Sequence, residues 1–186
     1  MPNAIEMLRE DHQKVKDLFE HFEETESGDK KQIVETTLRE LEIHTSIEEE
    51  IFYPAARQAL EGIDGEEGDV IDEAWEEHHV VKLLAAELKK MRVTDERYEA
   101  KFTVLAESVK HHIEEEEGEL FPKLEGHIEE EELGERMMER KEKLQQQPSS
   151  ASKSRSGTSK ARSAASRSKG KQSRGKKARK ASAGRR

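Results

Sequence analysis

Residues 44–48 (His-Thr-Ser-Ile-Glu) and residues 112–116 (His-Ile-Glu-Glu-Glu) are the two stretches that decide the fold. In each stretch a His and a Glu stand four residues apart, and an α-helix turns about 100° per residue, so both side chains lie on one helix face. The stretches are offset by 68 residues, and each Glu is followed six residues later by a proline, Pro54 or Pro122. This repeat predicts two related helix hairpins.

Apolar residues recur at intervals of three and four through the first 147 residues, without strict alternation, which indicates helices. Four long helices are expected, the second beginning near Lys30 with a break or kink at Pro54, and a fifth, shorter helix over 129–144. Amphipathic helices of about 20 residues joined by short turns form an up-down antiparallel four-helix bundle. The predicted fold class is therefore all-α, with two pseudo-symmetric helix hairpins in the bundle.

Charge divides the chain into two opposite parts. Residues 1–147 hold all 42 acidic residues and 19 of the 33 Lys and Arg, a net charge of −23, whereas residues 148–186 hold 14 basic residues and no acidic one. The last segment has no large apolar residue with which to build a core, so we expect it to be disordered. The predicted organisation is a four-helix bundle over 1–125, a short C-terminal helix over 126–147 and a disordered basic tail over 148–186.

Four histidines occupy apolar stripes, one on each long predicted helix. One such His is commonly a hydrogen-bonded core residue, but here that explanation must hold four times. It must also account for Glu48 and Glu116 in the same stripes, where an unpaired buried carboxylate is costly and a metal ion removes the cost. His78 is preferred to His79 because an acidic residue precedes it, as one precedes His12. The predicted metal ligands are His12, His44, Glu48, His78, His112 and Glu116.

Other candidates receive other assignments. His111 and Glu115 share the four-residue spacing and are the runner-up pair. His21 falls on the helix face opposite His12 and is expected in solvent, and His127 is given no role. The acidic runs around the two ligand Glu residues are expected to be solvated faces. Trp75, one turn before the third ligand His, is either a core packing residue or a wall of the metal pocket.

The ligand set points to a pair of metal ions. Cysteine is absent, which excludes disulfides and thiolate sites. Four imidazoles and two carboxylates exceed the four ligands of tetrahedral zinc and suit two first-row ions with bridging carboxylates. The mixture favours two iron ions, with manganese or zinc ranked below. Water, an oxo or hydroxo bridge, or dioxygen must complete the coordination, so the site is open to chemistry.

The same positions carry a family resemblance. They are Asp11-His12, His44 with Glu48 and Ile51-Phe52-Tyr53-Pro54, Glu77-His78, and His112 with Glu116 and Leu120-Phe121-Pro122. Over about residues 1–125 the chain resembles the haemerythrin HHE cation-binding domain family. The resemblance implies a bundle that holds a non-haem di-iron centre, with the six residues as ligands and both Glu as bridges. Oxygen-carrying haemerythrins have a second His on the third helix and an Asp five after the last His. Here position 82 is Lys, 74 is Ala and 117 is Glu, which argues against reversible oxygen carriage but not against di-metal binding.

Three functions from different classes follow as hypotheses. The first is a di-iron protein that binds or senses dioxygen, nitric oxide, peroxide or iron. The second is a di-iron enzyme, peroxidase-like, catalase-like or ferroxidase, that protects against oxidative stress. In the third, the metal is structural and the tail carries the function. No catalytic residue is assigned, because the chain has neither a Ser/His/Asp nor a Gly-rich phosphate motif.

The basic tail predicts a polyanionic partner. Its 14 positive charges can neutralise phosphates, and without aromatic side chains it has no base-stacking platform, so sequence-neutral DNA or RNA binding is expected. The alternative is that residues 148–186 fold back on the acidic domain or only aid solubility. No apolar run approaches the roughly 20 residues of a membrane span. We therefore expect no membrane partner and a cytoplasmic protein, with association to the nucleoid through the tail.

Overall fold

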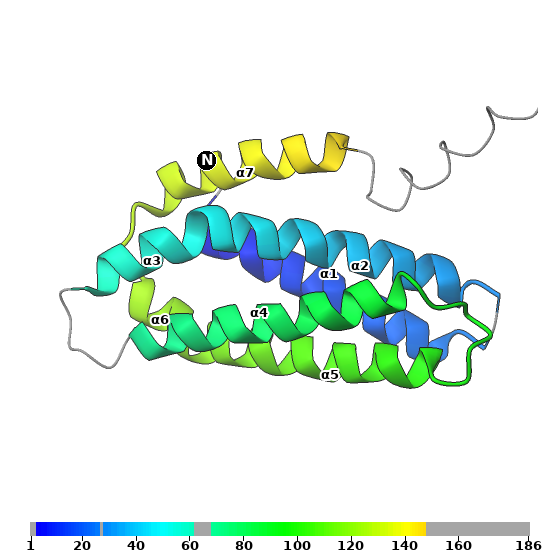
Figure 1. The fold of residues 1–186 in the computed structure, drawn as a ribbon. Helices are drawn as coiled ribbons and strands as arrows, with labels where there is room; N and C mark the ends of the chain where they lie inside the picture. Colours follow the sequence, from blue (N-terminus) through cyan, green and yellow to red (C-terminus); the bar gives the residue numbers. More distant parts are fainter. Residues whose placement is uncertain (1–2, 27, 62–67, 148–186) are drawn as a thin grey trace, which may run out of the picture.

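The computed structural model describes residues 3–26, 28–61 and 68–147, and the regular elements in these ranges are all helical. The long helices lie side by side with alternating chain direction (Figure 1), which confirms the predicted bundle of two hairpins. The predicted disordered tail lies outside the described residues. The long helices are α1 (Ala4–Glu24), α2 (Lys30–Ile47), α4 (Gly68–Leu88) and α5 (Tyr98–Glu115).

Of the break or kink predicted at Pro54, the break does not occur, because the second helix continues through the proline. A proline lacks an N–H and its ring clashes with the carbonyl four residues back. In both hairpins a π-helical turn precedes the proline, and there the Tyr53 N–H donates to the Glu48 carbonyl and the Phe121 N–H to the Glu116 carbonyl, five residues back. The wider turn accommodates the proline, and the helix continues. The elements are η1 (Glu48–Phe52) leading into α3 (Tyr53–Leu60), and η2 (Glu116–Leu120) leading into α6 (Phe121–Leu124).

Two apolar clusters make up the core, with a polar layer between them. The first includes residues of α3, α6, the start of α1 and a C-terminal helix, α7 (Glu130–Gln146), and the second lies toward the other end of the bundle. On α1, His12 lies between Leu8 of the first cluster and Val15 of the second. The polar layer is therefore enclosed by apolar side chains from both ends, which excludes bulk water from it.

The inner face of α4 buries Ala74 in place of Trp75, the residue expected to pack there. Ala74 is buried, whereas Trp75 is 41% exposed, with its ring centroid 6.2 Å from that of Tyr53. Both positions fit helical spacing from Ile71, at three and four residues, and the larger side chain takes the outer one. Trp75 is therefore not a core residue, and the expectation that it packs inside was wrong.

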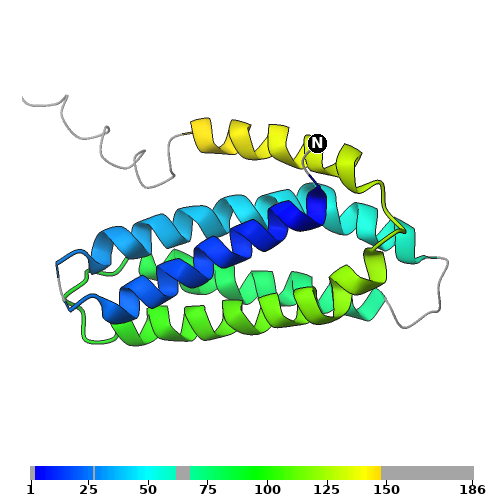
Figure 2. The ribbon, with the colours of Figure 1, turned by 180° about the vertical axis from the view of Figure 1, so that it is seen from behind.

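A further helix, α7 (Glu130–Gln146), lies along α1 and α2 outside the four-helix core (Figures 1 and 2). Gly126, at φ 78°, turns the chain after α6, a conformation that favours glycine. Leu133 and Met137 pack into the first apolar cluster. Arg39 of α2 donates to the carbonyls of Leu144 and, at 2.9 Å, Gln147, so the C-terminal end of α7 is tied to the bundle.

None of the described helices combines the length and apolar composition that crossing a membrane requires.

Candidate metal centre

The structure brings the six predicted ligand residues together in the polar layer. Each histidine comes from a different long helix, and each glutamate is the first residue of a π-helical turn. All six are at most 4% exposed. They are His12 and His44 of the first hairpin, His78 and His112 of the second, and the two glutamates Glu48 and Glu116.

The first hairpin contributes one pair of imidazoles to this cluster. His44 Nε2 lies 3.1 Å from Glu48 Oε2, and His12 Nε2 lies 3.2 Å from Glu116 Oε2 and 4.0 Å from Glu48 Oε1. One ligand atom from each of these four residues lies within 4.8 Å of the others. Two imidazoles and two carboxylates thus surround one position that could hold a metal ion.

The second hairpin contributes the other pair. The Nε2 atoms of His78 and His112 are 3.0 Å apart. His78 Nε2 lies 3.3 Å from Glu48 Oε2, and His112 Nε2 lies 3.5 Å from Glu116 Oε2. Glu48, His78 and His112 make up a second group with ligand atoms within 4.8 Å of one another. Both glutamates therefore face both pairs of imidazoles, which is the arrangement that two ions with shared carboxylates require.

Several ligand atoms in the layer lack a partner of their own. Both carboxylate oxygens of Glu48, Oε2 of Glu116 and Nε2 of His12 are buried with no hydrogen-bond partner among the described residues. Buried polar atoms are almost always hydrogen-bonded, and buried charges are paired or coordinate metals. These four atoms belong to the predicted ligands and lie within the group of ligand atoms around one position, so the residues present fit a bound cation.

Burial and the neighbouring charges shift the pKa values of the two ligand carboxyl groups in opposite directions. Burial, and then the negative charge of Glu116, raise the pKa of Glu48 well above its usual range. Burial would also raise the pKa of Glu116, but the nearby imidazoles of His112 and His12 outweigh it and hold that pKa well below its usual range. Without a cation, one of the two carboxyl groups therefore keeps a proton.

Three of the four imidazoles bond a second carboxylate through Nδ1. Such partners fix the tautomer and ring orientation of a metal-binding His and leave Nε2 free to bind. Glu49 and Glu117 sit in acidic runs that the sequence analysis assigned to solvent, and for these two residues that expectation was wrong. The sequence feature that could have identified them is their position directly after each ligand Glu, again 68 residues apart. The contacts are His12 with Glu117 at 2.8 Å, His78 with Glu49 at 3.0 Å and His112 with Glu77 at 2.7 Å.

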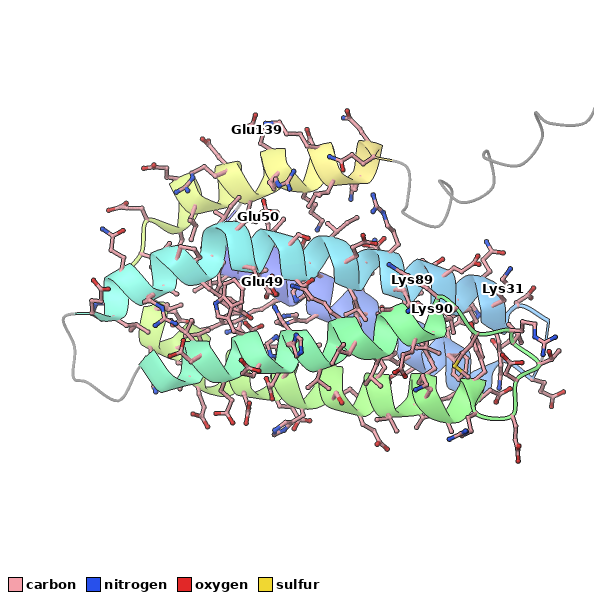
Figure 3. The ribbon with its side chains drawn as sticks, in the orientation of Figure 1. Lys31, Glu49, Glu50, Lys89, Lys90 and Glu139 are labelled. Atoms are coloured by element: carbon pink, nitrogen blue, oxygen red, sulfur yellow. The ribbon has the colours of Figure 1, made fainter. Side chains whose placement is uncertain are left out.

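Lysines in turn pair with these outer carboxylates. Lys82 pairs with Glu49, and Lys16 Nζ lies 3.5 Å from Glu117. Figure 3 shows Glu49 between α2 and α4 and its neighbour Glu50 on the side of α7, where Glu50 pairs with Arg140 at 2.6 Å. Adjacent residues of one acidic run thus pair with different helices, Glu49 with α4 and Glu50 with α7.

Tyr53 is a site residue that the sequence analysis did not single out. Its hydroxyl donates to Glu116 Oε1 at 2.8 Å and lies 3.3 Å from His78 Nε2. Burial, followed by the charge of Glu116, raises the pKa of Tyr53 well above its usual range, so the phenol keeps its proton. The residue 68 positions later is Phe121, whose ring stacks 5.8 Å from that of His12. The two halves of the centre are therefore chemically different.

The remaining histidines lie outside the cluster. His21, His79 and His127 are exposed, as expected for His21. His111 is exposed too, with Nε2 3.2 Å from Glu115 Oε1, so the runner-up pair forms a surface contact away from the buried layer.

A four-helix bundle with a buried layer of imidazoles and carboxylates defines a cation-binding helical bundle. The family model described as "Hemerythrin HHE cation binding domain" matches residues 3–124, and the chain belongs to this family. The crystal structure of a hemerythrin HHE cation binding domain-containing protein from Mycobacterium kansasii is similar, with a TM-score of 0.65 and 29% identity over 77% of this chain and 88% of that one. Among curated proteins, none matches this chain.

Proposed function

We propose that this chain binds two metal ions, with iron as the favoured metal, and uses them to bind or sense a small ligand. His12 and His44 would hold one ion, and His78 and His112 the other. Glu48 and Glu116 would bridge both. The observation that carries the proposal is the set of buried, unpartnered ligand atoms at the centre of the cluster.

The ligand set favours iron because it mixes imidazole with carboxylate and contains no sulfur. When bound, a pair of iron ions supplies electron transfer and affinity for dioxygen, peroxide or nitric oxide. Six side chains do not fill two six-coordinate shells, so solvent or such a small ligand has room to bind. Neither position one turn from His78 holds an additional His, since Ala74 and Lys82 stand there, which supports sensing or binding over reversible oxygen carriage.

The chain's own residues prepare the site for this chemistry. Glu49, Glu77 and Glu117 accept hydrogen bonds from the Nδ1 atoms of their histidines and so orient each Nε2 toward the centre. The apolar clusters above and below exclude water, which strengthens electrostatic interactions inside. The affinity and potential of the site are thus set by contacts that are already formed in the folded chain.

A second candidate is an oxidoreductase that acts on peroxide or ferrous iron. The observation that favours it is Tyr53, a protonated hydroxyl within 2.8 Å of Glu116 Oε1 at the centre, because a positioned proton donor is what peroxide chemistry requires. Peroxide consumption by the iron-loaded protein would support this candidate. A loss of that consumption in Tyr53→Phe, with iron retained, would assign the role of proton donor to Tyr53.

The basic tail is proposed to bind DNA or RNA without sequence preference, which would place the cytoplasmic protein at the nucleoid. The support is the 14 positive charges and no negative charge in residues 148–186. Truncation after Gln147 is expected to abolish binding to a mixed-sequence DNA duplex, and binding by the full chain is expected to weaken steeply with salt. Binding that survives truncation would contradict the proposal. A cellular effect lost on truncation but kept in His44→Ala would favour the tail as the functional part.

Metal analysis of protein purified anaerobically tests the main proposal. We expect two iron ions per chain and a near-ultraviolet charge-transfer band after exposure to air. His12→Ala and His78→Ala should each lower the iron content, and His21→Ala, which changes an exposed His on α1, should not. An iron-free wild type after reconstitution, or equal iron contents in all three variants, would overturn it.

A further inference from the structure

We propose that α7 is coupled to the metal centre through Lys141, a positioning residue that holds Asp11 as the hydrogen-bond acceptor for His44. This inference rests on the proposed function, because it concerns the affinity for the two ions. It gives a role to a helix that lies beyond residues 3–124, the part matched by the family model.

His44 is the exception among the four imidazoles. The other three have a carboxylate oxygen within 3.0 Å of Nδ1. His44 Nδ1 is 3.9 Å from Asp11 Oδ2, and both of these atoms are buried without a hydrogen-bond partner among the described residues. A donor and an acceptor that face each other in this way need a shift of only about 1 Å to form a normal hydrogen bond.

Asp11 is held from its other side by α7. Its Oδ1 pairs with the ammonium of Lys141, and the side chains of Asp11 and Lys141 are both largely buried. Lys141 continues the inner stripe of α7, four residues after Met137 and eight after Leu133, both of which are buried. A lysine at such a position must satisfy its charge locally, and Asp11 is the group that does so.

Among the residues that the structure describes, the second hairpin has no equivalent of this contact. Glu77, 66 residues after Asp11, bonds His112 directly at 2.7 Å. Within the described residues the ion pairs of Glu77 are with His112 and, at 3.8 Å, His111. The cluster therefore has three imidazoles with a preformed acceptor and one, His44, whose acceptor Asp11 is positioned by a helix outside the four-helix core. The two ions should respond differently when α7 is perturbed.

The expected size of the effect follows from the role of outer carboxylates. Losing such a partner lowers metal affinity by about 10–100-fold. Lys141→Met removes the cation but leaves Asp11 in place, so we expect about 10-fold weaker binding of the ion held by His12 and His44. Because coupling between two sites is reciprocal, metal binding should in turn stabilise the docking of α7.

The test is an anaerobic titration of the full-length metal-free protein with Co²⁺, followed by calorimetry and visible absorption. Lys143 is the matched control, because it lies on the same helix and pairs only with exposed Glu139 among the described residues. We expect wild type and Lys143→Met to bind two ions alike, Lys141→Met to bind one of the two about 10-fold more weakly, and Lys141→Arg to recover most of the loss. Equal binding of both ions by Lys141→Met and wild type, or equal weakening of both, would overturn the coupling.

Hydrogen exchange keeps the inference testable if Lys141→Met does not fold. In the wild type, loading with Co²⁺ should slow exchange of the amides of α7, and unchanged exchange there would overturn the coupling. A wild type that binds no Co²⁺ would overturn the proposed function itself, which separates the two failures.

Discussion

Replacing Glu48 by Gln should stabilise the metal-free protein while removing its response to metal. Glu48 is fully buried, and neither of its carboxylate oxygens has a hydrogen-bond partner among the described residues. A buried unsatisfied polar group costs about 1–3 kcal/mol. A glutamine has nearly the same shape and is neutral without taking up a proton, whereas Glu48, whose pKa is raised by burial and by Glu116, must bind a proton on folding at neutral pH. The glutamine amide can also donate to the Glu116 carboxylate. We therefore expect the free energy of unfolding of metal-free Glu48→Gln to exceed that of wild type by about 1–3 kcal/mol.

Metal should reverse this order. An ion present at 100 times its dissociation constant stabilises the folded state by about 2.7 kcal/mol per site, so two sites add about 5 kcal/mol to wild type. Glu48 faces both pairs of imidazoles, and its loss removes a ligand from both ions. Glu48→Gln should therefore gain little stability from metal, and metal-loaded wild type should become the more stable of the two.

Urea unfolding followed by circular dichroism, at pH 7.5 with and without Fe²⁺ under anaerobic conditions, measures both effects. Glu114→Gln is the matched control, because Glu114 is exposed in the same kind of acidic run and surface substitutions usually stay within about 0.5 kcal/mol. Metal-free Glu48→Gln that is less stable than wild type, or that gains as much from iron, would refute the argument that this carboxylate is held for a cation.

Three further predictions concern pH, the outer carboxylates and the phenol. Although burial opposes it, the charge of Glu116 and the hydrogen bond that His112 donates to Glu77 raise the pKa of His112 above its ordinary 6.5. The stability that this protonated imidazole contributes is complete below pH 6.5 and is lost as pH rises through the raised pKa. Metal affinity, in contrast, increases with pH because the ion must displace that proton. Thermal scans from pH 6 to 8.5 should thus give opposite slopes for the metal-free and metal-loaded forms, and parallel slopes would contradict this. Glu117→Gln should lower affinity for Co²⁺ by about 10-fold or more by weakening the orientation of its His partner, as measured by calorimetry; unchanged affinity would show that the contact at 2.8 Å has no such role. Tyr53→Phe should destabilise the metal-free protein by about 1 kcal/mol in urea unfolding, because Glu116 Oε1 loses a donor, and no loss would show that the bond is not formed in solution.

Helical periodicity and the 68-residue repeat were sufficient to predict the bundle and the convergence of its buried histidines. A stripe with a period of 3.6 residues fixes which side chains face inward, and His12 and His44 follow from that rule. The rule could not predict which of Ala74 and Trp75 faces inward, because both positions fit the period. Which side chain is buried depends on how much room the neighbouring helices leave.

The parts of the site that the sequence could not reveal depend on contacts between elements. Tyr53 lies five residues after Glu48, which in a regular α-helix is a different face, and the π-helical turn brings the two together. Glu49 and Glu117 act across helices, so their partners depend on how the hairpins pack. Lys141 reaches Asp11 only because α7 folds back along the first hairpin.

X-ray absorption at the iron edge of the loaded, full-length protein tests the central claim most directly. Two ions sharing Glu48 and Glu116 predict a shell of nitrogen and oxygen only, with imidazole scattering and a second iron at about 3.5–4 Å. A spectrum without an iron neighbour, from protein that holds a single ion or ions bound far apart, would contradict the claim.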